Sequence, residues 1–284
     1  MRDTILVVNT NICIIIKVIK KGVKNMIHKE VKEVMMCYSS RLNEMFPDQV
    51  VGVYVYGSTV LNAFHPESSD IDFVTVLDRE LTEEEVSKVT SLHKELSADH
   101  PLVKKFECEY LFLDEQKQLP LHSAFLYFEG TKCKGKRRLM KMAVYQLVHD
   151  SYAVYGPDFS AYQASIDWQD IMQEMDYNLN QYIASKVSKS YLFLFNSWIE
   201  FIVLTECRIY YTLKTGKITS KELACEEVLK DFESSDCDIL HEALRIRGRV
   251  QKKSNYKNRW QRKKATIHFI NFLRAHCNQV FLFK

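Results

Sequence analysis

The sequence predicts an α+β fold in which a small domain of strands and helices precedes a domain made of helices. Two patterns predict it. Between residues 27 and 112, segments of helical periodicity alternate with runs of β-branched and aromatic residues. From about residue 135 onward, almost every segment has apolar residues at helical spacing. A chain of 284 residues with 46% hydrophobic residues is long enough to bury the core of one large or two modest domains.

The first domain is predicted to begin with a helix at residues 27–46, which ends before Pro47. A second helix is expected to begin at Ser58, directly after the first strand stops at Gly57, and a third in LTEEEVSKVTSLHKELSA, where a threonine is followed by acidic residues. Three runs rich in β-branched and aromatic residues predict the strands, namely VVGVYVYG, IDFVTVL and FECEYLFLD. The predicted order is therefore helix, strand, helix, strand, helix, strand.

The second domain is predicted from helical periodicity alone. Six segments have this periodicity, at 136–152, 168–185, 189–215, 220–230, 238–250 and 258–279. The turn-forming run VYGPDFS lies between the first two of them. We therefore expect an N-terminal extension at residues 1–25, a mixed domain at 26–150 and a helical domain at 151–284.

The N-terminal segment does not have the pattern of a signal peptide or a membrane anchor. Polar residues at 9–11 and Lys17 interrupt its apolar run, which never reaches the roughly 18 uninterrupted apolar residues of a membrane span. The eight cysteines form no C-x-x-C pair, so we expect reduced thiols and a cytoplasmic protein. A formal charge of +3 requires no polyanionic partner.

Asp70 and Asp72 lie two residues apart at a predicted strand, so we expect both side chains on one face. Carboxylates held that close repel one another unless a cation lies between them, and Mg²⁺ prefers one or two carboxylates together with phosphate oxygens and waters. For D-x-D alone, a solvated edge strand is the alternative. The apolar neighbours Ile71, Phe73 and Val74 predict a buried strand and favour the metal.

Gly57 and Ser58 lie where the first strand is expected to turn into a helix, twelve residues before the first aspartate. Glycine lets a backbone approach a ligand closely, and a helix N-terminus offers free N–H groups to a phosphate. A lone G-S is a turn in most proteins. Its spacing from Asp70 and Asp72 makes it a candidate phosphate site.

The stretch GSTVLNAFHPESSDIDFVTV resembles the signature of the nucleotidyltransferase superfamily that includes DNA polymerase β, in which G-S is followed on the next strand by D-x-D. Together with YGPD at 155–158, LTECRIYYTLKTGKITSKELA at 204–224 resembles the spectinomycin and streptomycin adenylyltransferases. This resemblance covers most of residues 50–230. It implies a polymerase β-like domain with a mixed sheet, a C-terminal α-helical bundle, and Mg²⁺-dependent transfer of AMP from ATP to a hydroxyl of an aminoglycoside antibiotic.

The resemblance also implies roles for individual residues. Asp70 and Asp72 would bind the metal, and Gly57 and Ser58 would bind the phosphates of ATP. Glu107, in the strand FECEYLFL, would accept the proton of the attacking hydroxyl and serve as a third metal ligand.

Three further residues have roles that follow only from the resemblance. Arg208 and Lys221 would hold the β- and γ-phosphates and neutralise the departing pyrophosphate. Glu109 stands where relatives carry a small polar residue, so either Glu107 or Glu109 could be the base. The alternative for Glu109 is an acid at the rim of the site, facing water.

The acceptor is expected to be spectinomycin rather than streptomycin. Relatives carry a histidine and an acidic residue at the positions of Phe201 and Trp198, and the acid helps some of them to recognise streptomycin. Glu200 and Glu206 are alternative cation-binding residues, or else solvated helix positions.

Two other functions remain open at this point. The basic segment RIRGRVQKKSNYKNRWQRKKA at 245–265 has interleaved aromatic residues, so the acceptor could be RNA, or else a protein. A solvated helix face explains the same segment. A catalytically silent binding module is the other alternative, against which the complete G-S, D-x-D and third acid argue. We expect ATP and a small molecule as partners, no nucleic acid or membrane, and a monomer or weak dimer.

Overall fold

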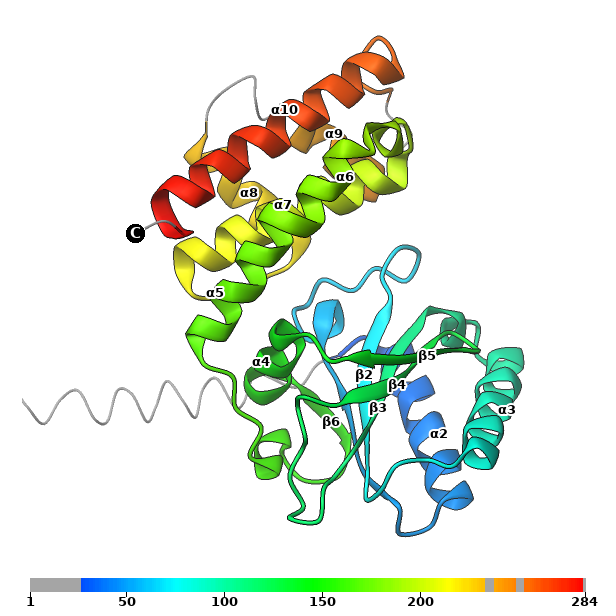
Figure 1. Ribbon diagram of the computed structural model, residues 1–284. Helices are drawn as coiled ribbons and strands as arrows, with labels where there is room; N and C mark the ends of the chain where they lie inside the picture. The colour runs from blue at the N-terminus through cyan, green and yellow to red at the C-terminus, as the bar shows by residue number, and fades with distance from the viewer. Residues whose placement is uncertain (1–26, 233–237, 249–252, 283–284) are drawn as a thin grey trace, which may run out of the picture. The chain divides into compact units, whose positions relative to one another are not determined.

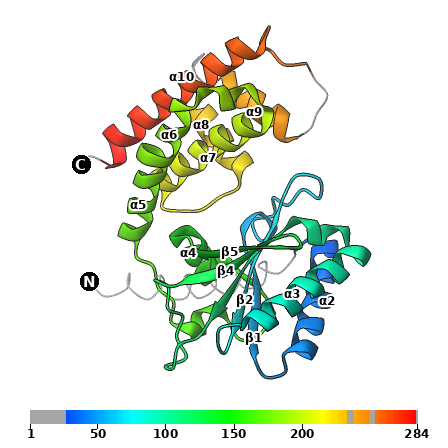
Figure 2. The ribbon, with the colours of Figure 1, turned by 45° about the vertical axis from the view of Figure 1, so that its right-hand side comes forward.

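The computed structural model describes residues 27–232, 238–248 and 253–282, so the extension predicted at residues 1–25 lies outside the described residues. The chain divides into two compact units, residues 1–165 and 166–284. The first contains a mixed sheet with helices and the second consists of helices, as the sequence predicts (Figures 1 and 2). In the described ranges, no helix is both long and apolar enough to cross a membrane.

The first unit is built on a six-stranded sheet with the order β5-β4-β3-β2-β1-β6. Its strands are β1 (Val50–Val55), β2 (Ile71–Leu77), β3 (Phe106–Phe112), β4 (Ala124–Glu129), β5 (Lys132–Arg138) and β6 (Tyr152–Tyr155). β2 and β3 are parallel, and the other neighbouring strands are antiparallel. β1, β2 and β3 are the three strands that the sequence predicts.

The sequence analysis missed the other three strands, and the helix expected at 136–152 is shorter than predicted. β5 occupies the start of that range, and the helix α4 begins only at Lys141 and ends at Asp150. β5 is an edge strand whose side chains are nearly all polar, so it lacks the alternation of a half-buried strand. β6 has four residues and pairs only with β1, which leaves too short a pattern to identify.

The helices α2 (Lys29–Met45) and α3 (Glu83–Asp99) cover one face of this sheet (Figures 1 and 2). Phe73 of β2 and Phe106 of β3 are fully buried in the core between the helices and the sheet. Side chains alternate between the two faces of a strand. The neighbours of these core residues, which include Asp72 and Glu107, therefore point to the opposite face.

A chain of buried hydrogen bonds ties both helices to the sheet. Tyr38 of α2 bonds through its hydroxyl to Tyr110 (2.7 Å) and Thr75 (2.8 Å). His93 of α3 bonds through Nε2 to the Tyr110 hydroxyl (2.8 Å) and through Nδ1 to the Gly130 carbonyl (2.7 Å). These bonds link α2 and α3 to β2 and β3, the strands that carry Asp72 and Glu107.

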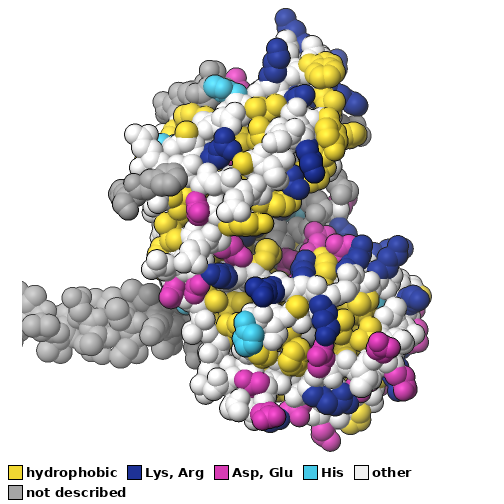
Figure 3. Space-filling view, in the orientation of Figure 1, with side chains coloured by type: hydrophobic (Ala, Val, Ile, Leu, Met, Phe, Trp, Pro, Cys, Tyr) yellow, Lys and Arg dark blue, Asp and Glu magenta, His cyan; other side chains and the backbone are white. Residues whose placement is uncertain are grey.

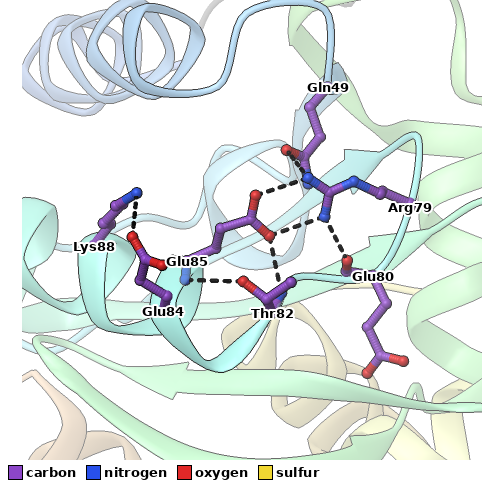
Figure 4. A network of polar contacts seen from close by, with 7 residues as sticks. All are labelled: Gln49, Arg79, Glu80, Thr82, Glu84, Glu85 and Lys88. Atoms are coloured by element: carbon purple, nitrogen blue, oxygen red, sulfur yellow. Dashed lines mark hydrogen bonds and ion pairs between the residues drawn. The ribbon is translucent and has the colours of Figure 1, made fainter.

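The start of α3 is fixed by the capping pattern that the sequence predicts. Glu85 N donates to the Thr82 hydroxyl (3.3 Å), and Thr82 N donates to the Glu85 carboxylate (2.9 Å). Arg79 binds the same carboxylate with both terminal nitrogens, at 2.9 and 2.8 Å (Figure 4). Hence the loop after β2 is anchored to the helix.

The second unit contains the helices α5 (Trp168–Tyr177), α6 (Ala184–Ser188), α7 (Asn196–Thr215), α8 (Lys221–Asp231), α9 (Asp238–Arg247) and α10 (Arg259–Cys277). A π-helical turn at Asn178–Ile183 joins α5 to α6. The long helix α7 packs against α8, α9 and α10. Its last residue, Thr215, is followed by the C-cap Gly216, whose φ of +67° is a conformation that glycine adopts without strain.

Candidate active site

Candidate carboxylates lie in register on the face of the sheet opposite to α2 and α3. Asp72 of β2 pairs with Glu107 of β3, and Glu107 pairs in turn with Glu129 of β4. Both Asp72 and Glu107 are half-buried. Asp70 is exposed and precedes β2, which begins at Ile71, so the expectation of two buried strand positions holds only for Asp72.

Gly57 lies directly against Asp72. Its φ is +71°, and a β-carbon added to it would lie 2.1 Å from Asp72 Oδ2. Tyr56 N donates to the Asp72 carbonyl (2.9 Å), and Gln146 of α4 donates to the Gly57 carbonyl (3.4 Å). Because only glycine fits both the backbone conformation and the space, the turn after β1 brings its backbone next to the Asp72 carboxylate.

The helix predicted to begin at Ser58 is absent from this described segment. Gly57–Thr59 forms one turn of 3₁₀ helix, and the chain leaves it with Asn62 in the left-handed region at φ +53°. The sequence predicted that the N-terminus of a helix at Ser58 would attract a phosphate, and this prediction is wrong because there is no such helix to supply a dipole. The close approach of backbone and carboxylate remains as the feature that could serve a phosphate and its cation.

Glu107 has the environment of a proton acceptor. Burial raises its pKa above the usual value, and the nearby charge of Asp70 raises it further. Tyr127, as a hydrogen-bond partner, and the charge of Arg137 act in the opposite direction. A carboxylate whose pKa lies above its ordinary range is better matched to accept a proton near neutral pH.

Glu109 does not face water, so the alternative of an acid at the rim is wrong. Its side chain is only 2% exposed and accepts a hydrogen bond from Arg137 Nε at 2.8 Å. Burial raises the pKa of Glu109, and Arg137 opposes that rise. Since Arg137 occupies this carboxylate, Glu107 is the better placed of the two acids for chemistry.

Sequence reasoning missed two residues of this face, Arg137 and Tyr127. The Arg137 guanidinium lies 3.2 Å from the centre of the Tyr127 ring while it binds Glu109. A buried acid needs a cationic partner, so Glu109 in an apolar strand was a signal for a neighbouring Arg or Lys. The partner could not be identified from the sequence, because Arg137 lies in β5, a strand that the sequence analysis did not predict.

The carboxylates fit Mg²⁺ only in combination with a nucleotide. Within residues 27–232, 238–248 and 253–282, no three His, Cys, Asp or Glu side chains form a group that could hold a metal ion. Mg²⁺ is commonly bound in proteins by one or two carboxylates, while phosphate oxygens and waters complete its octahedron. Asp70 and Asp72 supply donors of that kind.

The two predicted phosphate-binding cations lie in the second unit, whereas Gly57, Ser58 and the carboxylates lie in the first. Arg208 is in the middle of α7 and Lys221 is the first residue of α8, and both are half-buried. Ser220 caps α8 by accepting a hydrogen bond from Leu223 N (3.2 Å). The structure thus places these cations on two helices that pack together.

The two glutamates considered for binding a cationic substrate differ in their surroundings. Glu206 is fully buried in the second unit, and neither of its carboxylate oxygens has a hydrogen-bond partner. Burial raises its pKa well above the usual value. Glu206 is therefore enclosed by its own unit instead of facing a substrate. Glu200 is half-buried and accepts a hydrogen bond from Arg247 (3.0 Å).

Phe201 and Trp198 form an aromatic surface on the second unit. Their rings pack edge-on at 6.0 Å, and Phe201 packs in the same way on Tyr182 at 6.4 Å. Lys186 lies over the Tyr182 ring at 4.5 Å and over the Trp198 ring at 5.7 Å. This surface offers no acid at the position of Trp198.

Three arginines of the basic segment 245–265 are held in ion pairs within the second unit. Arg245 and Arg262 bind Glu242 at 2.8 and 3.0 Å. Arg247 bridges Glu200 and Glu222. Carboxylates of the same unit therefore already pair with these three arginines, which lets them stabilise the packing of that unit.

Comparisons with known proteins agree with the division into a mixed unit followed by a helical unit. A family model for a nucleotidyltransferase domain matches residues 37–141, and a model for the C-terminal domain of aminoglycoside adenylyltransferases matches residues 165–273. The chain is similar to a spectinomycin 9-adenylyltransferase of Campylobacter jejuni, with 22% identity over 64% of this chain and 71% of that protein. A spectinomycin 9-adenylyltransferase of Staphylococcus aureus strain Mu50 is 25% identical over 65% of this chain and 73% of that protein.

The fold is also similar to a solved structure. A spectinomycin adenyltransferase from Enterococcus faecialis, crystallised with ATP and spectinomycin, superposes with a TM-score of 0.63. The match covers 86% of this chain and 97% of that chain, at 18% identity. At this identity the likeness concerns the fold.

Proposed function

Since the chain belongs to the nucleotidyltransferases that carry an aminoglycoside adenylyltransferase C-terminal domain, we propose that it transfers AMP from ATP to a hydroxyl group of spectinomycin. The observation that carries the proposal is the alignment of Asp72 with Glu107, with the backbone of Gly57 against Asp72. The carboxylate that would hold the cation of the nucleotide and the carboxylate that would accept the proton then lie on adjacent strands. Transfer of a nucleotidyl group to a hydroxyl needs both functions close together.

In the proposed reaction, Asp70 and Asp72 would hold Mg²⁺ together with the phosphates of ATP, and Gly57 and Ser58 would let those phosphates approach. The ion, when bound, neutralises the negative charge that builds up on the triphosphate. Glu107 accepts the proton of the acceptor hydroxyl. As the acceptor oxygen forms its bond to the α-phosphorus, the bond from that phosphorus to the β-phosphate oxygen breaks and pyrophosphate leaves.

The proposed role of Arg208 and Lys221 is to neutralise the leaving pyrophosphate. Guanidinium and ammonium groups form charge-assisted hydrogen bonds with phosphate oxygens, and such bonds strengthen as charge moves onto the leaving group. The match of the adenylyltransferase C-terminal model to residues 165–273, which contain both cations, supports this assignment.

Spectinomycin is proposed over streptomycin for two reasons. The relatives described above are named for spectinomycin. In addition, Trp198 stands where streptomycin-binding relatives carry an acid, and its surroundings include the cation of Lys186. A cationic guanidino group would gain no charge pairing there. We further propose a cytoplasmic location, since the six cysteines within the described residues are free thiols.

The proposal is tested by incubating the protein with Mg²⁺ and ATP labelled at the α-phosphate, in separate reactions with spectinomycin, streptomycin, tRNA and a protein mixture. We expect label on spectinomycin alone, with release of pyrophosphate. In a parallel reaction with ATP labelled at the γ-phosphate, label on the acceptor would indicate a kinase. Label on tRNA or on a protein would establish another acceptor, and no label in any reaction would indicate a binding module. The Asp72→Asn protein is the control for contaminating activity.

A further inference from the structure

Glu129 is a charged residue of the candidate active site that the proposed reaction does not use. We propose that its carboxylate binds an ammonium group of the aminocyclitol acceptor and so places the acceptor hydroxyl beside Glu107. The inference rests on the proposed function, because that function supplies a cationic acceptor. Glu129 is the last residue of β4, and it is not part of the G-S, D-x-D or third-acid pattern.

Glu129 lies on the same face of the sheet as the proposed metal ligand and the proposed base. In the register of the strands, Glu107 has Asp72 as its partner on one side and Glu129 on the other. Residues that are partners in register share a face of the sheet. Neighbouring strands lie about 4.8 Å apart, so Asp72 and Glu129 flank Glu107 at a separation of about 10 Å.

The proposed reaction determines on which side of Glu107 the acceptor binds. In such a transfer the attacking and leaving oxygens lie roughly in line, on opposite sides of the phosphorus. Because Gly57 lies against Asp72, the triphosphate and its cation would occupy the Asp72 side of Glu107. The acceptor would then approach over β4, where Glu129 is the partner of Glu107.

The Glu129 carboxylate is accessible and is held in its charged form. Its side chain is 48% exposed, and Lys134 Nζ lies 2.7 Å from its Oε2. The Tyr127 hydroxyl donates to its Oε1 at 3.1 Å. A carboxylate has about four lone-pair sites, so these two donors orient the group and leave sites for an ammonium group.

The ion pair with Lys134 does not close this carboxylate to an acceptor. The Lys134 side chain is 44% exposed, and an ion pair between two exposed side chains contributes little free energy. An incoming ammonium group can therefore share the carboxylate with Lys134 or replace it. Glu109 differs, because its 2% exposed side chain is bound by the half-buried Arg137.

The first experiment measures acceptor binding without turnover. Spectinomycin is titrated by calorimetry into the protein saturated with Mg²⁺ and α,β-methylene-ATP, whose methylene bridge prevents transfer of AMP. Glu129→Gln keeps the size of the side chain but removes its charge, so we expect the Kd for spectinomycin to rise about tenfold or more. The Kd for α,β-methylene-ATP should stay within about twofold. An unchanged Kd for spectinomycin, or a rise only in that for the nucleotide, would overturn the proposal.

Glu80→Gln is the matched control. Glu80 pairs with Lys136 of β5, and its side chain is 44% exposed, close to the value for Glu129. Lys136 is the partner in register of Leu126, which packs against the core below α2 and α3, so this ion pair belongs to the other face of the sheet. The Kd for spectinomycin should therefore stay within about twofold. An equal rise in both variants would mean that the two pairs only stabilise the hairpin, and Glu129 would have no role in binding.

Lys134→Gln tests the same carboxylate in the opposite direction. It removes the cation that competes with the acceptor and leaves Glu129 charged. The Kd for spectinomycin should fall or stay within about twofold of the unaltered value. A rise as large as that expected for Glu129→Gln would show that the intact ion pair, and not the carboxylate, matters for the acceptor, which contradicts the proposal.

Steady-state kinetics separate this inference from the proposed function. In Glu129→Gln the KM for spectinomycin should rise about tenfold while kcat stays within about twofold, because Glu107 and the metal ligands are intact. If the unaltered protein bound spectinomycin but transferred no AMP, the proposed function would fail, and the calorimetric comparison would still decide the role of Glu129. If it transferred AMP while Glu129→Gln kept a normal Kd and KM, the inference would fail and the function would stand. No binding of spectinomycin to the unaltered protein would overturn both.

Discussion

Gly57 shows how one residue can determine whether a site forms. Because its φ is positive, replacing Gly57 by any other residue should lower the stability of the fold by about 1 kcal/mol, whatever surrounds it. The contact with Asp72 adds a second cost that concerns function, because a β-carbon would displace the carboxylate. These two costs can be measured separately, since Gly216 has a similar φ of +67° and no atom within 4 Å of its β-carbon position.

We therefore predict that Gly57→Ala lowers kcat/KM by about 100-fold or more, because Asp72 can no longer take its place beside the turn. Gly216→Ala should lower stability by about 1 kcal/mol through its backbone conformation and leave kcat/KM within about twofold. Steady-state kinetics and urea unfolding of both variants decide this. Comparable activity in the two variants would show that the Gly57–Asp72 contact is unimportant.

At Asp72 the prediction separates catalysis from folding. Asp72→Asn removes a proposed metal ligand and also relieves repulsion with Glu107, its partner in register. AMP transfer should therefore be abolished, and without Mg²⁺ the melting temperature should equal or exceed that of the unaltered protein. Near-normal turnover in Asp72→Asn, measured with labelled ATP, would contradict the metal assignment.

The two glutamates of β3 should respond differently to the same substitution. Glu107→Gln keeps the shape of the side chain but cannot accept a proton, so kcat should fall by about 100-fold or more while ATP affinity is kept. Glu109→Gln should affect kcat less and stability more, since it leaves Arg137 without its buried partner. Kinetics and thermal unfolding measured together test this, and a reversed order would mean that Glu109 is the base.

The sequence was sufficient to place Gly57 after β1, Asp72 in β2 and Glu107 in β3, because each lies in a local pattern of strand and turn. It was not sufficient for Glu109 and Arg137. Their pairing joins β3 to β5, and it depends on the hairpin that folds β4 and β5 back onto the sheet. A contact between strands that no local pattern predicts is visible only once the register is known.

At the scale of elements, the long helices could be predicted because their apolar residues recur at helical spacing over many turns. α2, α3, α7 and α10 each have 17 residues or more, and the sequence analysis found all four. Short elements form through contacts with their neighbours, which a local pattern does not contain. β6 is a strand because it pairs with the edge of β1. The helical turn at Gly57 does not extend because Asn62 adopts the left-handed conformation.

We predict that stability depends on pH because His93 of α3 is buried against the sheet. Burial lowers the pKa of His93 to about 4, and the bond to the Gly130 carbonyl opposes this only in part. The unfolded chain takes up a proton near pH 6.5, whereas the folded protein stays neutral until about pH 4. Stability should therefore fall as the pH falls through this window, by up to about 3 kcal/mol.

Urea unfolding between pH 4 and pH 8 measures this effect. The His93→Gln protein should be less stable at pH 8 but should show a flatter pH dependence, since the titrating group is gone. His122→Gln, which changes an exposed loop histidine, is the control and should keep the slope of the unaltered protein. An unchanged slope in His93→Gln would assign the pH dependence to other groups.

At the scale of the whole molecule, many charged side chains pair with a partner in their own unit. On the face shown in Figure 3, acidic and basic side chains of the first unit lie among one another. In the second unit, Glu242 holds Arg245 and Arg262, and Arg247 holds Glu200 and Glu222. The basic segment at 245–265 therefore contributes fewer available charges than its composition suggests.

The last prediction follows from this separation of internal and exposed charges. Lys253 and Lys264 are exposed, Lys263 lies over the exposed Trp260 ring at 5.3 Å, and Lys252 lies outside the described residues. Changing all four lysines to glutamine should leave AMP transfer to spectinomycin within about twofold, because a small acceptor makes no phosphate contacts with them. If RNA were the acceptor, each lost phosphate contact would weaken binding and flatten its salt dependence. Arg262→Gln is the contrasting variant. It breaks a buried ion pair, and it should lower the melting temperature whichever acceptor is used.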